Sequence, residues 1–146
     1  SLSEDQIKLI LNLKDFSTGM DTMRQIFFAK FSLECFKPGE DKDVKKLFTT
    51  LQEEIIDFVL PSENNHGYAA FGHLIGYGAK YYGYLWSKVY ALDLFKVIKE
   101  NNFSKEIGQR YINCILSKGG SDKPMNLLRD FLQREPNSEA FFENLG

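Results

Sequence analysis

Residues 72–84 read GHLIGYGAKYYGY and lead into an apolar segment that continues to residue 100. Glycine permits unusual backbone angles but weakens a helix, so residues 72–84 are expected to form a loop or a helix start that packs closely or moves. From about residue 80 to residue 100, apolar side chains occupy most of a helical circumference, which is typical of a buried central helix. The segment therefore predicts a core helix that follows a glycine-rich turn.

Helical patterns also precede this segment. Ser3 and Gln6 have the spacing of a capping box, which predicts a helix that continues through Leu13. A break at residues 16–19 separates it from a second helix, in which apolar residues recur at helical spacing. The sequence Lys-Pro-Gly at residues 37–39 is expected to end that second helix.

The clearest amphipathic pattern lies between Asp43, which is expected to cap a helix, and Pro61, which is expected to end it. Three further helices are predicted at about residues 104–117, 122–133 and 138–144. Such patterns indicate helices that lie on a core. The apolar stripe of the helix after Asp43 consists of Val44, Leu47, Phe48, Leu51, Ile55, Phe58 and Val59.

No segment alternates apolar and polar residues as a strand would, so we predict an all-α fold of about seven helices in one domain, residues 1–146. The net charge of −2 argues against a nucleic-acid partner. No apolar run reaches the ~20 residues that cross a membrane, so no membrane partner is expected. Cys35 and Cys114 are expected to be buried free thiols, which fits a reducing compartment.

Two kinds of residue in this chain could take part in chemistry. His66 and His73 are the only histidines, and they lack the spacing of metal ligands. Tyr77, Tyr81 and Tyr84 follow at i, i+4 and i+7, so a helix would place them on one face. Neutral phenols there could donate hydrogen bonds to an oxyanion, or the rings could simply pack in the core. Spacing alone leaves both interpretations open.

Residues 73–86, HLIGYGAKYYGYLW, resemble the C-terminal signature of the thimet oligopeptidase family of zinc metallopeptidases. Several other blocks are similar to that family, in its order and at about its spacing. They are MRQI at 23–26, VYALDLF at 89–95, GQRY at 108–111, ILSKGGS at 115–121 and FLQREPN at 131–137. The likeness thus extends over essentially the whole chain.

This resemblance implies part of the C-terminal catalytic lobe of a neurolysin-like metallopeptidase, in which two helical lobes flank a deep channel. Short peptides are the implied substrates, and zinc is the implied cofactor of the full-length enzyme. The family's His-Glu-x-x-His motif would lie upstream of this chain, so the chain is expected to be a C-terminal fragment without zinc and without activity of its own. The implied location is intracellular, either cytoplasmic or mitochondrial.

The resemblance also assigns roles residue by residue. Tyr81 and Tyr84 resemble the pair that binds the scissile carbonyl and its oxyanion. Tyr77 resembles the tyrosine of the flexible loop, and His73 resembles the histidine that lines the substrate cleft. The loop glycines are Gly76 and Gly78.

Two alternatives remain open at this stage. A single glycine stands between Ile75 and Tyr77, as in the mitochondrial intermediate peptidase branch, so processing of mitochondrial precursors is one of them. A different class is a helical interaction module without catalysis. In either case, apolar surface left exposed on a fragment is expected to favour self-association.

Overall fold

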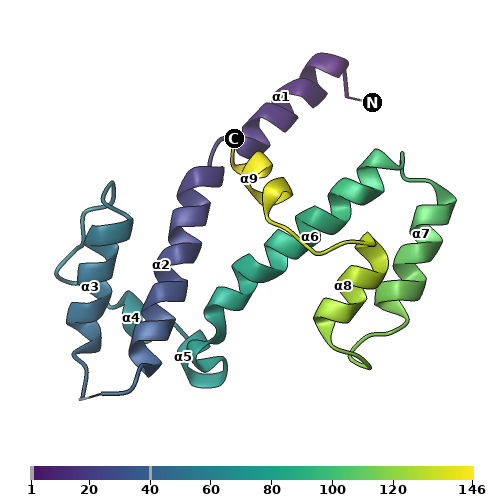
Figure 1. Cartoon of the computed structure of the whole chain (residues 1–146). Coiled ribbons are helices and arrows are strands. Elements are labelled where there is room, and N and C mark those ends of the chain that lie inside the picture. The colour runs from purple at the N-terminus through teal and green to yellow at the C-terminus, as the bar shows by residue number, and fades with distance from the viewer. Residues whose placement is uncertain (1, 40) are drawn as a thin grey trace. The chain divides into compact units, whose positions relative to one another are not determined.

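The structure is a computed structural model that describes residues 2–39 and 41–146, apart from the side chains of residues 14 and 15. The described chain is helical and contains no strand, which confirms the all-α prediction (Figure 1). The α-helices are α1 (Glu4–Asp15), α2 (Thr18–Phe36), α3 (Val44–Ile55), α4 (Gly67–Ala70), α5 (His73–Gly76), α6 (Gly83–Glu100), α7 (Lys105–Tyr111), α8 (Pro124–Leu132) and α9 (Glu139–Leu145). A 3₁₀-helix, η1 (Gly78–Tyr82), precedes α6, and a π-helical turn, η2 (Ile112–Leu116), extends α7.

Both predicted helix caps are present, and a third helix has a side-chain cap of the same kind. Ser3 and Gln6 form a capping box at α1, in which each side chain bonds the other residue's backbone N–H. Asp43 accepts the N–H of Lys46 at 2.9 Å and caps α3. Ser104 caps α7 in the same way, by accepting the N–H of Ile107 at 3.3 Å. These caps satisfy backbone donors that a helix end would otherwise leave unpaired.

Two helix predictions need correction. The helix after Asp43 ends at Ile55 and not at Pro61, because Ile56 leaves the helical region with φ −120° and ψ 56°. Adjacent β-branched isoleucines followed by aspartate make a weak helix end, so Phe58 lies outside the helix and is 52% exposed.

The expected buried central helix is also different in the structure. In α6 only Asp93 is fully buried, whereas Trp86 is 53% exposed and Phe95 is 49% exposed. A helix can bury its whole circumference only where neighbours surround it. Within residues 86–146, α6 packs on only part of its surface, where Leu94 contacts the core of that segment.

The chain divides into two compact units, residues 1–85 and residues 86–146. In the first unit, α2 and α3 pack side by side (Figure 1), and their phenylalanines form an aromatic core. Phe31 is fully buried and meets Phe48 edge to face at 5.1 Å between ring centroids. Burial of each such side chain contributes about 1.5–3 kcal/mol, so this core fixes the position of α2 beneath the glycine-rich segment.

The second unit has its own core, formed by α7, α8 and part of α6. Phe131 is fully buried there and meets Tyr111 edge to face at 5.7 Å. Asp93 of α6 is also fully buried and forms an ion pair with Arg134. The organisation of residues 1–146 as one domain of a longer protein stays a prediction.

Cys35 and Cys114 are free thiols, but both are half-buried and not fully buried as expected, because each lies at the margin of its core. Burial raises the pKa of Cys35, an effect that the charge of Lys42 opposes only in part.

No helix of the described chain has both the length and the apolar character needed to cross a membrane.

Candidate functional site

The glycine-rich segment consists of two short helical pieces joined by a left-handed residue. Helix α5 spans His73–Gly76, and Tyr77 caps it by donating its N–H to the carbonyl of His73 at 2.8 Å. Gly78 then takes φ +58°, a conformation that glycine adopts without the steric cost of a Cβ atom. The chain continues as η1 and enters α6 at Gly83. Tyr77 therefore lies between α5 and η1, Tyr81 lies in η1, and Tyr84 lies in the first turn of α6.

A buried serine anchors this turn to α2. Ser32 is fully buried, and its hydroxyl donates a 2.6 Å hydrogen bond to the carbonyl of Gly78, 46 residues later in the sequence. The bond holds the backbone between Tyr77 and Tyr81, the two tyrosines on either side of the left-handed glycine. Because Ser32 lies on the buried face of α2, this bond ties the turn to that helix.

The turn brings the three predicted tyrosines together around His73. The ring of Tyr84 stacks on Tyr77 at 5.4 Å and meets Tyr81 edge to face at 5.0 Å between centroids. The His73 ring lies 5.0 Å from Tyr81 and 5.8 Å from Tyr84. The Tyr84 hydroxyl lies 3.3 Å from His73 Nε2, within hydrogen-bonding distance. The spacing i, i+4, i+7 thus does gather the rings, even though the segment is not one continuous α-helix.

The tyrosines differ in exposure. Tyr81 is only 7% exposed and packs against both Phe28 and Phe71 at the end of the aromatic core. Tyr77 is 38% exposed and Tyr84 is 45% exposed. The Tyr81 ring therefore belongs to the core, whereas the rings of Tyr77 and Tyr84 lie at its surface.

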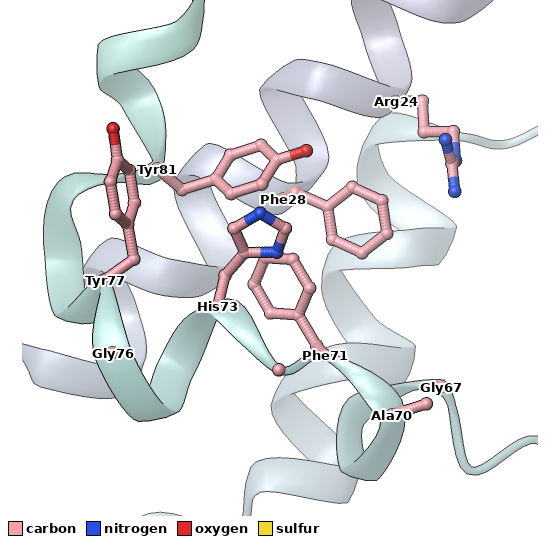
Figure 2. A pocket seen from close by; sticks show the side chains of 10 residues that line it. Arg24, Phe28, Gly67, Ala70, Phe71, His73, Gly76, Tyr77 and Tyr81 are labelled. Carbon is pink, nitrogen blue, oxygen red and sulfur yellow. The ribbon is translucent and has the colours of Figure 1, made fainter.

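An open pocket of about 850 Å³ lies beside this cluster (Figure 2). Its wall combines aromatic side chains with glycine backbone and carries one guanidinium group, that of Arg24. The predicted residues that line it are His73, Gly76, Tyr77 and Tyr81. The other lining residues are Arg24, Phe28, Gly67, Ala70, Phe71 and Gly72.

Of the other predicted residues, Tyr84 reaches this site through its contacts with His73 and the neighbouring tyrosines. Gly78 contributes the left-handed turn and does not line the pocket. His66 is placed elsewhere, with its Nδ1 atom 3.1 Å from the hydroxyl of Tyr68.

The environment of Tyr81 keeps its hydroxyl protonated. Burial raises the pKa of Tyr81, and the nearby Gln25 side chain and the Arg24 charge lower it by less. Tyrosine ordinarily ionises near pH ~10, so the neutral phenol persists throughout the physiological range. Tyr81 is therefore suited to donate a hydrogen bond to developing negative charge.

The described residues do not fit a complete zinc site. No group of three or more histidine, cysteine, aspartate or glutamate side chains is placed to hold a metal ion within the described ranges. At the pocket, His73 is the one residue of these types, and its Nε2 atom contacts Tyr84.

Sequence reasoning missed several residues of the site. Arg24, Phe28 and Phe71 line the pocket, and Ser32 holds the turn. Arg24 did carry a signal, because it belongs to the MRQI block that resembles the family. Ser32 carried no signal, because nothing in its local pattern indicates a partner at Gly78.

Replacing Ser32 by alanine tests the anchor. The change leaves the Gly78 carbonyl without its buried donor, and an unsatisfied buried group costs about 1–3 kcal/mol. We expect a loss of that size in the free energy of unfolding, together with faster amide hydrogen exchange in residues 77–82. Val44→Ala, a change in α3 that does not touch the turn, is the control. Equal exchange in both variants would show that Ser32 does not hold the turn.

Comparison with known proteins gives a consistent picture. The sequence model of peptidase family M3 matches residues 1–146. The chain is 34% identical to oligopeptidase A of Escherichia coli over 99% of its own length, which is 22% of that protein. It is 28% identical to saccharolysin of Saccharomyces cerevisiae, covering 99% of this chain and 21% of that protein. It is 29% identical to mitochondrial intermediate peptidase of Mus musculus, and the match covers 99% of this chain and 20% of that protein. The chain thus spans about a fifth of the length of the curated relatives it matches.

Proposed function

Because this chain belongs to peptidase family M3, we propose that it is the C-terminal, substrate-binding portion of a zinc metalloendopeptidase that hydrolyses short peptides. The observation that supports this proposal most strongly is the meeting of Tyr81, Tyr84 and His73 beside one open pocket. Residues from separate helical pieces converge there, although core packing alone would not need a pocket beside them. The proposed setting is the C-terminal lobe of a neurolysin-like fold.

In the proposed mechanism, the residues of this chain act on the scissile carbonyl. Tyr81 and Tyr84 donate hydrogen bonds to the carbonyl oxygen and stabilise it more strongly as it becomes an oxyanion. His73 contacts the Tyr84 hydroxyl and orients it. Tyr77 stacks on Tyr84 and, with Gly76, forms the wall against which the peptide lies. The metal ligands belong to the rest of the proposed enzyme.

The test of the proposed function is metal-dependent peptide hydrolysis by the full-length protein. We expect cleavage of short peptides, loss of cleavage when a chelator removes the metal, and recovery when zinc is restored. Mass spectrometry of a panel of peptides of increasing length would measure it. Chelator-resistant cleavage, or no cleavage at all, would overturn the proposal. For this chain alone, metal analysis should find no stoichiometric zinc.

The same peptide panel separates the alternatives. Precursor processing is supported by the single glycine before Tyr77, and it predicts cleavage of mitochondrial presequences in preference to unrelated short peptides. The helical interaction module predicts no cleavage of any peptide. An intracellular location, cytoplasmic or mitochondrial, goes with either peptidase. Exposed apolar residues of the chain alone, among them Ile75 at 93% and Leu60 at 89%, support its proposed self-association.

A further inference from the structure

The pocket beside the tyrosines contains one permanent charge, and that charge is positive. Arg24 extends from α2 at the edge of the pocket, beside Phe28 (Figure 2). None of the residues that line the pocket is acidic. Among the described residues, no carboxylate forms an ion pair with Arg24 either. A guanidinium group that lines an open pocket without a described counter-ion is available for a ligand.

The structure also orients this guanidinium group. Its Cζ atom lies 5.1 Å from the centroid of the Phe28 ring, a cation–π arrangement that restricts the side chain. Phe28 in turn stacks on Phe71, with ring centroids 4.6 Å apart, so the partner ring is held against the core. The donors of arginine form a rigid fork that matches the two oxygens of a carboxylate.

The charge of Arg24 acts on the same site as the tyrosines. It is one of the influences that lower the pKa of Tyr81, although burial of the phenol has the larger, opposite effect. Arg24 and Tyr81 thus belong to one electrostatic environment as well as one pocket. A pocket of about 850 Å³ has room for part of a peptide that contacts both residues.

We propose that Arg24 binds a carboxylate of the peptide substrate and thereby makes this pocket selective for negatively charged peptide segments. This inference rests on the proposed peptidase function and specifies its substrate class. The carboxylate has two chemical sources, the free C-terminus of a short peptide or the side chain of an aspartate or glutamate. The other role for Arg24 is to pack on Phe28, which would affect all peptides equally.

The experiment uses four peptides of one sequence, with a free or amidated C-terminus and with glutamate or glutamine at one position. Binding to the chelator-treated full-length protein is measured by isothermal titration calorimetry, so the readout does not depend on hydrolysis. Arg24→Met keeps an apolar stem against Phe28 and removes the charge. We expect it to weaken binding of the carboxylate-bearing peptides by about ten- to a hundredfold, as for a charged hydrogen bond.

The pattern across the four peptides identifies the source. A loss that disappears on amidation assigns the C-terminus, and one that disappears with glutamine assigns the side chain. Arg24→Lys should recover part of the affinity, because lysine keeps the charge without the fork. An equal loss on all four peptides, or no loss, would overturn the inference. If the wild-type protein binds the peptides by charge but never cleaves them, the proposed enzymatic function fails and the role of Arg24 stands.

Discussion

Replacing Asp93 by asparagine is expected to lower the free energy of unfolding by about 3 kcal/mol, the largest stability effect of a single change that we predict. The Asp93 carboxylate is fully buried and accepts hydrogen bonds from both terminal nitrogens of Arg134, at 2.9 and 2.5 Å. It also accepts the backbone N–H of Asn137 at 2.9 Å. Asparagine would turn an NH₂ group toward these donors and leave the Arg134 charge without its partner.

The size of this effect follows from the difference in exposure between the two partners. The Asp93 side chain is 1% exposed, whereas that of Arg134 is 39% exposed and can be rehydrated in part. We therefore place the loss at the low end of the ~3–5 kcal/mol typical of a broken buried pair. Urea unfolding followed by circular dichroism measures it. The control is Glu143→Gln, which breaks the exposed pair with Lys96 and should cost no more than about 1 kcal/mol.

The same pair predicts a sensitivity to acid. Burial alone would raise the pKa of Asp93, but the hydrogen bonds from Arg134 and Asn137 outweigh it and hold the pKa below its ordinary value. A carboxyl group with a lowered pKa in the folded state contributes stability above the unfolded value of about 3.9 and loses it as the pH falls through the folded value. Asp93→Asn should remove this part of the acid dependence. If Asp93→Asn left both the free energy of unfolding and its dependence on acidic pH unchanged, the ion pair would not stabilise the chain.

The parts of the fold that could be predicted are those set by local chemistry. The capping box at Ser3 and the cap at Asp43 depend on residues three positions apart, and the structure confirms both. The burial of α6 could not be predicted in the same way, because burial depends on which other helices surround it. Trp86 and Phe95 belong to the apolar residues that cover most of the circumference of α6, yet both are about half exposed in the described chain.

The candidate site likewise combines features that local sequence predicts with contacts that depend on how separate helices pack. The spacing of Tyr77, Tyr81 and Tyr84 predicted that they share one face if the segment is helical, and their rings do meet although the segment is not one α-helix. Ser32 and Gly78 are 46 residues apart, and Asp93 and Arg134 are 41 apart. No periodicity links such positions, because their contacts arise only when separate helices pack. The resemblance placed Asp93 and Arg134 in separate similar blocks, but only the structure shows that the blocks meet.

Replacing Tyr81 or Tyr84 by phenylalanine in the full-length protein is expected to lower kcat by about 10²–10³-fold, with a small effect on KM. Each change removes one hydroxyl and keeps the ring, so the aromatic contacts with His73 remain. A donor that binds the oxyanion more strongly than the ground-state carbonyl affects the chemical step most. Steady-state kinetics on one short peptide would measure the effect. The matched control is Tyr82→Phe, because Tyr82 is next to Tyr81, is 43% exposed and does not line the pocket.

The two tyrosine variants should differ in a second respect, which separates catalysis from packing. Tyr81 is almost fully buried and Tyr84 is about half exposed. Loss of the Tyr81 hydroxyl is therefore expected to change the free energy of unfolding more than loss of the Tyr84 hydroxyl. If oxyanion binding is the shared role, both variants lose kcat to a similar extent while their unfolding free energies differ. If packing were the role, kcat would fall only in the variant that loses stability. A Tyr84→Phe enzyme with unchanged turnover would exclude Tyr84 as an oxyanion donor and leave its contact with His73 as a structural one.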